Sequence, residues 1–357
     1  MKRVLNGALC LLAAVAAAAA IYAGYAFAAY YRLEDRLDLP VENDSAAAVQ
    51  LETAYTVLSY NVGFGAYSAD YSFFMDGGVY SRAFSPEAVR KDLAGAAAVL
   101  EREAPDFALL EEVDVAATRS YQIDQRPLLR SALPDHGAVF AQNYDSPYLL
   151  WPLNQPHGKS LAGMLTLSRY HMDSSLRRSL PVESGLSKFM DLDRCYSVTR
   201  LPTAEGGTLC LYTVHLSAYT SDGSIATQQL RQLLSDMAGE YAAGNYAVCG
   251  GDFNKDLLGN SAERFGVSGE GETWAQPFPT ELLPEGISLV APYDAAVPVP
   301  SCRNADSAYD PASSFVLTVD GFLVSGNVTV QSAAVVDTGF AWSDHNPVKL
   351  VFSLNAP

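Results

Sequence analysis

Residues 246–254, YAVCGGDFN, decide the fold, because an apolar run leads directly into an acid and an amide. The run is typical of a buried strand, and Asp252 and Asn254 follow where it ends. The same arrangement recurs at other apolar runs of the chain. The residues concerned are Asn61 after YTVLSY, Glu111 and Glu112 after DFALL, His215 after LYTV, Asp320 after FVLTV, and Asp344-His345-Asn346 before PVKLVFSL. A rigid sheet can hold such side chains at its edge for a site in the adjoining loops.

Strand-like runs alternate with helical ones from residue 54 onward. Residues 85–105 predict a helix with Ser85 as N-cap and Pro86 at the first helical position, and residues 225–245 predict a second helix. Predicted strands cover 54–63, 106–114, 164–169, 194–201, 208–216, 246–254, 314–325, 328–337 and 347–354. Many strands with few helices indicate two sheets packed face to face with helices outside. Residues 260–314, rich in Pro and Gly, are expected to form loops around a substrate.

The N-terminal segment predicts a membrane anchor. Residues 4–31 carry no charge, and at about 1.5 Å per residue they can span a hydrocarbon core of about 30 Å. Lys2 and Arg3 precede this run, and the segment after it is net acidic, so the positive-inside rule keeps the N-terminus in the cytoplasm and exports the rest. A cleaved signal peptide, with Ala26-Phe27-Ala28 as the small-x-small site, is the alternative. The predicted organisation is an anchor at 1–31, a linker at 32–53 and a catalytic domain at 54–357.

The net negative charge of the chain indicates which classes of partner it disfavours. Lys2 and Arg3 are the only charged residues among the first 31, so the rest of the chain holds 40 acidic and 21 basic side chains, a balance of −19. Nonspecific nucleic-acid affinity comes from basic side chains that displace counterions, so nucleic acid is disfavoured as a partner. Cys195, Cys210, Cys249 and Cys302 lack zinc-ligand spacing, and Cys210 and Cys249, which lie within apolar strand-like runs, are expected to be buried thiols.

Phosphoester hydrolysis explains the choice of residues at the strand ends. Magnesium binds through oxygen, and hydrolysis needs both a metal to neutralise phosphoryl charge and a base to activate water. Glu112, Asp252 and Asp344 can serve a metal, and Asn61 and Asn254 can hold metal-bound or phosphoryl oxygens. His345 can be the base if Asp320 fixes its tautomer, and His215 can donate to a phosphate oxygen. Taken singly, each residue also fits a simpler interpretation: a turn, a cap or a packed histidine.

The ordered set LSYNVG, LLEEVD, TVHLSAY, GGDFN, VDGFLVS and SDHNPV resembles the endonuclease/exonuclease/phosphatase superfamily over residues 54 to 354. The resemblance implies a four-layer α/β sandwich with two packed mixed sheets, its site at one end of the sheets, and Mg²⁺ or Mn²⁺ as cofactor. By position, Asn61, Glu112 and Asp344 resemble the metal-site residues, and Asp252 and Asn254 resemble the pair that contacts nucleophile and phosphate. His345 resembles the catalytic histidine, Asp320 the carboxylate that orients it, and His215 the phosphate-contacting histidine.

Lys159 is a further candidate for substrate binding. His157-Gly158-Lys159-Ser160 resembles the end of a P-loop, but Leu153 stands where the first glycine is required. Lys159 can still face a phosphate, and a solvated loop lysine is the alternative.

We therefore expect a membrane-anchored, metal-dependent phosphoesterase that acts outside the cytoplasm on a phosphomonoester or phosphodiester. Its tether favours a lipid headgroup or a small organophosphate as substrate. An extracellular nuclease of the same fold and a non-catalytic module that binds phosphate-bearing ligands are the alternatives. Nothing in the sequence implies a protein partner.

Overall fold

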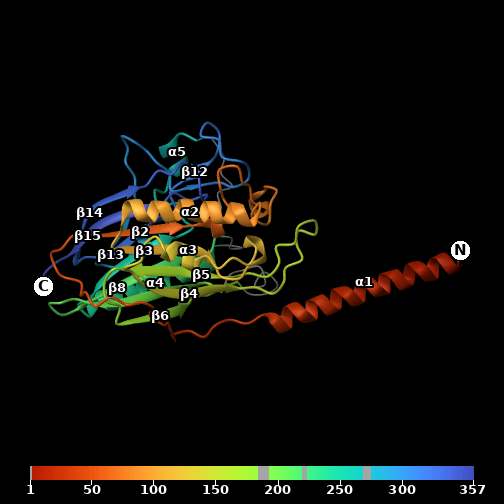
Figure 1. Cartoon of the computed structure of the whole chain (residues 1–357), viewed down its shortest axis with the longest axis horizontal. Coiled ribbons are helices and arrows are strands. Elements are labelled where there is room, and N and C mark those ends of the chain that lie inside the picture. Colours follow the sequence, from red (N-terminus) through yellow and green to blue (C-terminus); the bar gives the residue numbers. More distant parts are fainter. Residues whose placement is uncertain (1, 184–192, 219–222, 268–274) are drawn as a thin grey trace.

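The computed structural model describes residues 2–183, 193–218, 223–267 and 275–357, and its domain is built on two β-sheets (Figure 1). The first sheet has the strand order β14-β15-β2-β3-β5-β4, and the second has the order β1-β6-β7-β8-β9-β13-β10. Each sheet contains one parallel pair, β2 with β3 and β8 with β9, among antiparallel pairs. The predicted pair of mixed sheets is confirmed.

The longer helices are α1 (Lys2–Ala29), α2 (Pro86–Glu103) and α4 (Ser224–Ala242), with short helices α3 (Arg126–Arg130) and α5 (Ser261–Phe265). The strands of the first sheet are β2 (Tyr55–Asn61), β3 (Phe107–Asp114), β4 (Gly137–Asp145), β5 (Leu161–Ser168), β14 (Val328–Val335) and β15 (Val348–Leu354). Those of the second are β1 (Leu37–Asp38), β6 (Ser174–Ser179), β7 (Cys195–Pro202), β8 (Thr208–His215), β9 (Tyr246–Asp252), β10 (Ile287–Val290) and β13 (Asp320–Ser325). A small ribbon pairs β11 (Cys302–Arg303) with β12 (Val316–Leu317).

Alternation along the strands divides the core into layers. Side chains of β2 and β3 point alternately to two faces, so Val57 and Leu109 pack between the sheets while Leu58 and Leu110 pack under α2. The corresponding outer cluster of the second sheet lies under α4 and includes Leu230, Leu233, Tyr212 and Cys249. The result is a four-layer sandwich of helix, sheet, sheet and helix.

Helix α2 begins and ends as its sequence predicts. The Ser85 hydroxyl accepts a hydrogen bond from the Ala88 N–H at 3.1 Å, and Pro86 occupies the first turn, where no amide hydrogen is needed. Ala104 adopts the left-handed conformation that closes the helix, one residue before Pro105. Because α2 joins β2 to β3, it fixes them as parallel neighbours whose carboxyl ends meet at one edge. Helix α4 does the same for β8 and β9.

Some elements differ from the sequence predictions. Residues 314–325, predicted as one strand, form β12 and β13, because Val316–Leu317 pair with β11 while Asp320–Ser325 pair with β9. Strands β4, β6 and β10 were not predicted. Residues 260–314 are mainly loops, although they also contain α5, β10 and β11; the part at 268–274 lies outside the described residues.

The predicted linker at 32–53 runs along the domain. Leu37 and Asp38 pair with β6, and Val49 is fully buried against the core between the sheets. Arg32 forms an ion pair with Asp193 at 2.8 Å.

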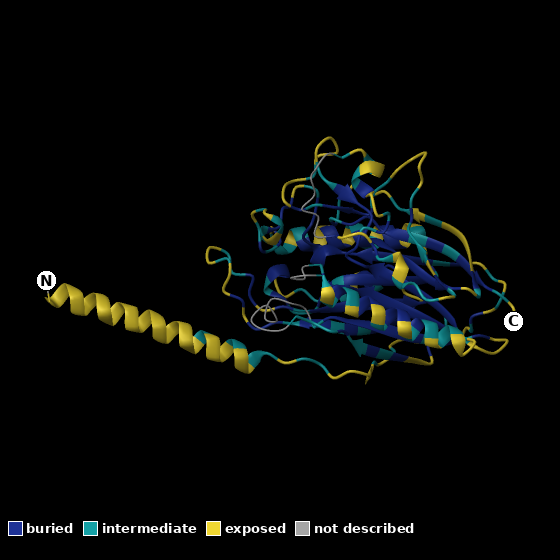
Figure 2. Ribbon diagram, turned by 180° about the vertical axis from the view of Figure 1, so that it is seen from behind, coloured by how far each residue is buried: buried dark blue, intermediate teal, exposed yellow. Residues whose placement is uncertain are grey.

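Helix α1 is a long apolar element that projects from the domain (Figures 1 and 2). Figure 2 shows it exposed along most of its length, and none of its residues is buried. Its length and composition are those of a helix that can cross a membrane, a property shared by signal sequences. The predicted N-terminal apolar helix is therefore confirmed.

Candidate active site

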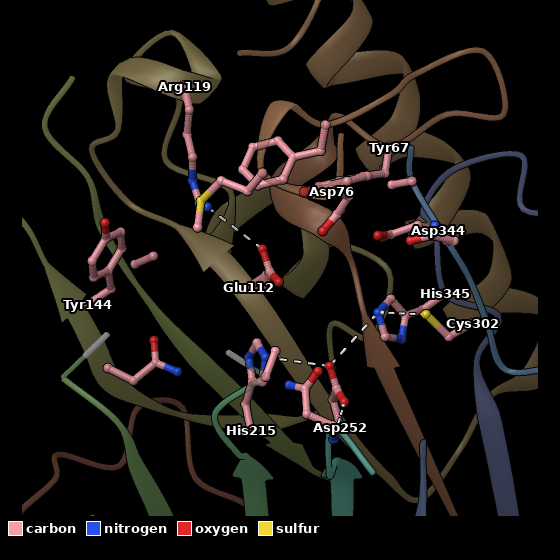
Figure 3. Close-up of a pocket in the computed structure, with 18 of the residues that line it drawn as sticks. Tyr67, Asp76, Glu112, Arg119, Tyr144, His215, Asp252, Cys302, Asp344 and His345 are labelled. Carbon is pink, nitrogen blue, oxygen red and sulfur yellow. Dashed lines mark hydrogen bonds and ion pairs between the residues drawn. The ribbon is translucent and has the colours of Figure 1, made fainter. Parts of the chain in front are cut away.

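The candidate site lies where the two parallel strand pairs end, in a cavity of about 300 Å³ (Figure 3). Asn61 ends β2, Glu112 lies near the end of β3, His215 ends β8 and Asp252 ends β9. The predicted site residues that line this cavity are Glu112, His215, Asp252, Asn254, Asp344 and His345. Six residues that are scattered through more than 230 positions of the sequence are thus brought together.

Sheet register explains how three of the site residues meet. Asp252 is paired in register with His215 of β8 on one side and with Asp320 of β13 on the other. Gly251 permits this close pairing, because a Cβ there would lie 1.9 Å from the carbonyl oxygen of Val214. The glycine before Asp252 is therefore required by the packing of β9 against β8.

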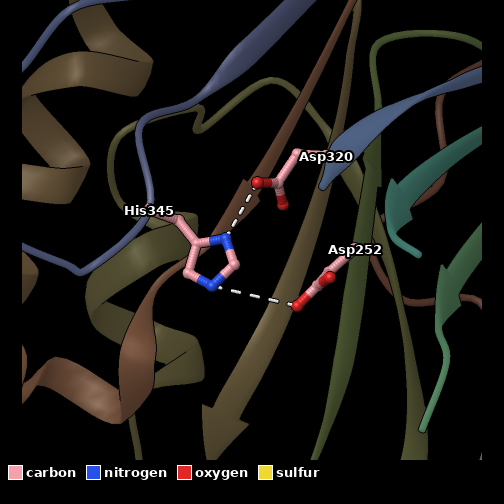
Figure 4. Close-up of side chains that lie close together, drawn as sticks. All are labelled: Asp252, Asp320 and His345. Carbon is pink, nitrogen blue, oxygen red and sulfur yellow. Dashed lines mark hydrogen bonds and ion pairs between the residues drawn. The ribbon is translucent and has the colours of Figure 1, made fainter. Parts of the chain in front are cut away.

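His345 is oriented by Asp320 (Figure 4). Nδ1 of His345 lies 2.8 Å from Oδ2 of Asp320, and because a carboxylate only accepts, Nδ1 carries the proton. The Ser301 hydroxyl donates to the same carboxylate oxygen at 2.7 Å. Nε2 of His345 lies 3.8 Å from Oδ2 of Asp252. Burial lowers the pKa of His345, but the charge of Asp320, its hydrogen bond and the neighbouring Cys302 together outweigh burial and hold that pKa well above its ordinary value.

Asp252 is the centre of the polar cluster. Its Oδ2 lies 3.5 Å from Nε2 of His215 and accepts a hydrogen bond from the Asn61 amide at 3.2 Å, while its Oδ1 accepts from the Asn254 N–H at 2.8 Å. Burial raises the pKa of Asp252 to about 7, against the opposing charge of His345. Burial, reinforced by Arg194, holds the pKa of His215 well below its ordinary value, so this imidazole is neutral at neutral pH.

Asn254 is held in a left-handed conformation with φ of 49°, which is uncommon outside glycine and asparagine. Its side-chain amide donates to the Leu216 carbonyl at 2.7 Å. This bond ties the loop after β9 to the loop after β8, so the two strand ends are locked together at the cavity floor.

Strand β3 is irregular at its two adjacent glutamates. The register between β3 and β5 shifts between Leu110 and Val113, and Glu112 has a φ of 56°. Such bulges redirect side chains beside active sites. Glu111 is fully buried and accepts from the Ser59 hydroxyl at 3.0 Å, whereas Glu112 lines the cavity.

Glu112 and Asp344 line the part of the cavity that fits a hard cation, and Asn61 lies beside Glu112 without lining the cavity. Glu112 and Asp344 are both carboxylates of this cavity, and the pKa of Asp344 is raised to about 6 by burial, with a further contribution from the charge of Glu112. The Asn61 amide donates to Glu112 at 3.4 Å and to Asp252 at 3.2 Å, so it lies between two carboxylates. The two carboxylates supply oxygen ligands and surplus negative charge, which is what Mg²⁺ or Mn²⁺ requires, while the Asn61 amide oxygen accepts from the Gly63 N–H at 3.0 Å.

Basic side chains on the cavity wall were not predicted. Arg119 is held by Asp114 at 2.9 Å, stacks on Phe64 with a guanidinium-to-ring distance of 3.9 Å, and lies 3.8 Å from Glu112. Arg194 and Arg303 also line the cavity. These arginines belong to no short motif, so the sequence offered no signal for them.

Lys159 lies outside the cavity, whereas one of the four cysteines lines it. Lys159 is exposed, forms an ion pair with Asp145 at 3.4 Å and is not among the cavity-lining residues. Cys195, Cys210, Cys249 and Cys302 are buried free thiols, which confirms the expectation for Cys210 and Cys249. Among them, Cys302 lines the cavity, with Sγ 3.6 Å from Nε2 of His345.

The sequence matches the model of the endonuclease/exonuclease/phosphatase family over residues 58–345. The chain belongs to this family. No curated protein sequence gives a significant match. In this chain, the family domain therefore follows a long N-terminal apolar helix.

Solved structures of this family share the fold. A family member from Beutenbergia cavernae DSM 12333 matches with 18% identity over 85% of this chain and 72% of its own, with a TM-score of 0.55. ANGEL2, a 2',3'-cyclic phosphatase solved with adenosine-2',3'-vanadate, matches with 17% identity over 91% of this chain and 100% of its own, with a TM-score of 0.55. The human Nocturnin catalytic domain with bound sulfate matches with 18% identity over 89% and 98%, with a TM-score of 0.52.

Proposed function

We propose that the protein is a divalent-metal-dependent phosphoester hydrolase. The observation that carries the proposal is the convergence of Asp320, His345 and Asp252 at the cavity, with distances of 2.8 Å and 3.8 Å joining the imidazole to the two carboxylates. His215 and Asn254 add hydrogen-bonding groups on the other side of Asp252. Titratable groups held in fixed geometry around a concave site are typical of hydrolytic catalysis.

The charge states favour a division of work between His345 and Asp252. His345, held in its charged form by Asp320, donates from Nε2 to a phosphoryl oxygen. Asp252, with a pKa raised to about 7, accepts the proton of the attacking water. The sequence interpretation gave the role of base to His345; the raised pKa of His345 favours Asp252 instead. Neutral His215 and the Asn254 amide contact the remaining phosphoryl oxygens.

Glu112, Asp344 and Asn61 would hold the divalent cation. When bound, the cation neutralises negative charge on the phosphoryl oxygens and lowers the pKa of a coordinated water. Arg119 and Arg194, which also line the cavity, add fixed positive charge for the phosphate.

A lipid headgroup or a small organophosphate is the favoured substrate. The cavity of about 300 Å³ is at the size of small-ligand sites, and α1 would hold the domain close to a bilayer on the extracytoplasmic side. The balance of −19 over residues 32–357 opposes a polyanionic substrate. Because the family also contains nucleases, nuclease activity is the second candidate.

The test is hydrolysis of bis-p-nitrophenyl phosphate and p-nitrophenyl phosphate by the full-length protein in detergent with Mg²⁺ or Mn²⁺. We expect activity that EDTA abolishes, and losses of about a hundredfold or more in Asp252→Asn and His345→Gln. His171→Gln is the matched control, because His171 pairs with Asp44 outside the cavity and its loss should leave the rate unchanged.

Two results would refute this function. Activity that persists in EDTA, or in both cavity variants, would remove the assigned machinery from the reaction. Calorimetry that shows tight binding of phosphate-bearing ligands, without turnover under any metal, would instead indicate a binding module.

A further inference from the structure

An uncharged loop leaves the cavity wall and returns to it. Tyr144 and His157 line the cavity, and between them residues 146–156, SPYLLWPLNQP, contain no Asp, Glu, Lys or Arg, in a chain of net charge −17. We call this segment the apolar loop. Its large side chains face solvent: Trp151 is 61% exposed and Leu153 is 74% exposed, with Tyr148 and Leu150 partly so. Exposed apolar side chains gathered in this way mark an interaction surface.

The apolar loop is bonded to the outer end of α1. The Tyr148 N–H donates to the Tyr25 hydroxyl at 3.0 Å, and the Tyr22 hydroxyl donates to the Tyr148 carbonyl at 3.1 Å. The Leu150 N–H lies 3.4 Å from the same Tyr22 hydroxyl. Tyr22 and Tyr25, three residues apart, lie on one face of the helix, so both reach the same segment.

Much of the loop backbone is satisfied without water. Leu149 and Gly158 exchange N–H to carbonyl bonds at 3.0 Å each, and the carbonyls of Trp151 and Pro152 accept from His157 and Gln155. Pro152 has no N–H. Together with the tyrosine hydroxyls of α1, these bonds lower the cost of moving the loop into an apolar medium, where unpaired backbone groups are expensive.

The contacts with Tyr22 and Tyr25 also set the level of the apolar loop relative to the membrane. Helix α1 has 28 residues and is about 42 Å long, whereas about 20 residues suffice to cross the hydrocarbon core. With the crossing begun at Val4, Tyr22 and Tyr25 fall at the far interface, where tyrosine and tryptophan concentrate in membrane proteins. The apolar loop, bonded to these two tyrosines, lies at the same level.

A second exposed pair lies beside the apolar loop. Met75 lines the cavity and Val79 is exposed, and both belong to the segment that leads to Ser81. The Ser81 N–H donates to Gln155 at 3.0 Å, and the Arg82 guanidinium donates to the Pro156 carbonyl at 2.7 Å. Hydrogen bonds therefore join the apolar loop to this segment, which reaches the cavity through Met75 and Asp76.

We propose that the apolar loop docks into the outer interface of the membrane that α1 crosses, and so presents the cavity to phosphoesters of lipid headgroups in that leaflet. The lipid specificity rests on the proposed function, whereas the docking does not. The partner that this surface binds is the bilayer itself. The loop is hydrogen-bonded to a helix of membrane-spanning length, and it carries no charge that would have to stay solvated by water.

Docking is tested by quenching of tryptophan fluorescence in the full-length protein. The chain has three tryptophans, Trp151, Trp274 and Trp342, so the difference between wild type and Trp151→Phe reports Trp151. In nanodiscs of phosphatidylcholine with brominated acyl chains, we expect a clearly larger fraction of the fluorescence to be quenched in wild type than in Trp151→Phe. Equal fractions would overturn the docking.

The consequence for catalysis is tested by a triple variant, Leu150→Ser with Trp151→Ser and Leu153→Ser, none of which lines the cavity. In nanodiscs of phosphatidylglycerol and phosphatidylethanolamine, headgroup release should fall about tenfold, as expected when one or two apolar side chains lose their burial. Hydrolysis of soluble bis-p-nitrophenyl phosphate should stay unchanged. Val330→Ser, on the edge strand β14 at the other end of the domain from α1 (Figure 1), is the control.

The outcomes separate the two proposals. Equal losses on lipid and soluble substrate, or no effect on lipid hydrolysis, would overturn the presentation of the cavity to headgroups. Hydrolysis of the soluble ester without hydrolysis of either phospholipid would overturn the lipid specificity and leave the proposed function standing. Bromolipid quenching of Trp151 without turnover of any phosphoester would refute the proposed function while supporting the docking.

Discussion

Glu111 and Glu112 are neighbours in β3, yet only Glu112 lines the cavity. The register shift beside them and the left-handed conformation of Glu112 send Glu111 into the interior, where it meets Ser59, and turn Glu112 toward Asn61 and Arg119. Regular alternation along a strand already sends neighbouring side chains to opposite faces, and the irregularity in β3 changes the direction in which Glu112 enters the cavity.

The two glutamates should therefore respond differently to mutation. Glu112→Gln removes a carboxylate from the proposed metal site, and we expect activity to fall about a hundredfold with a weaker response to Mg²⁺. Glu111→Gln changes a buried group outside the cavity, and we expect activity within about threefold of wild type. Steady-state kinetics over a Mg²⁺ series measure both. The assignment of Glu112 fails if the two variants exchange these behaviours.

Ser301 is expected to position the catalytic pair. Its hydroxyl donates to Asp320 and accepts from the backbone N–H of Val319 and Asp320, so Ser301→Ala should lower kcat about tenfold with little change in KM. Ser325, at the far end of β13, also accepts a backbone bond, from Ala247. Ser325→Ala should cost similar stability, about 1 kcal/mol, without the loss of kcat. Equal kcat values for the two variants would remove the positioning role.

Asp92 should make stability depend on pH. It is buried in α2, and burial raises its pKa from 3.8 to about 7, with Lys91 opposing the shift. Between these two values the folded protein keeps a proton that the unfolded chain has lost, so the free energy of unfolding falls as pH rises from about 4 to 7. Asp92→Asn should remove this fall and stabilise the protein at pH 8 by at most about 4 kcal/mol.

Chemical denaturation of Asp92→Asn and wild type at pH 4 and pH 8 measures the difference. The exposed Asp173→Asn is the control and should follow wild type at both pH values. A variant of Asp92 that gains nothing at pH 8 relative to pH 4 would contradict the expected sign.

Cation binding should be detectable without turnover. A ligand that binds only the folded state stabilises it by about 2.7 kcal/mol at a hundred times its Kd, so Mn²⁺ or Mg²⁺ should raise Tm of the wild type by several degrees. Asp344→Asn should weaken that rise. Differential scanning calorimetry with and without EDTA makes the measurement, and an undiminished rise in Asp344→Asn would place the cation elsewhere.

The leader is expected to remain attached. If α1 is a membrane anchor, the protein from the membrane fraction should have the intact mass of the chain that includes Lys2 and Arg3, and external protease should digest the domain in intact cells. A mature protein that begins after Ala28 would establish the signal-peptide alternative.

Much of the fold followed from local patterns. Apolar runs with polar ends predicted β2, β3, β8, β9 and β15, and cap chemistry predicted α2, because these signals are carried by adjacent residues. The same strand ends indicated the residues that line the cavity. The pairing of Asp320 with His345 was first proposed from chemistry, because a histidine base needs a carboxylate to fix its tautomer, and the resemblance to a family pointed to the same pair.

Other features depend on tertiary contacts that no short segment encodes. Arg119 faces the cavity because Asp114 and Phe64 hold it there, and the sequence around it is an ordinary loop. The break between β12 and β13 arises from different partner strands, which an unbroken apolar run does not reveal. The role of residues 32–53 as part of the packed domain likewise depends on contacts with β6 and with Thr203.

The position of β15 has a consequence for biosynthesis. This strand lies between β14 and β2 within the first sheet, and the segment just before it supplies Asp344 and His345 to a site whose other members come from residues as early as Asn61. A nascent chain in which residues 343–354 have not yet been synthesised lacks the His345 imidazole and strand β15 of the first sheet. Catalysis therefore cannot begin before this last strand has been synthesised and has paired with β2.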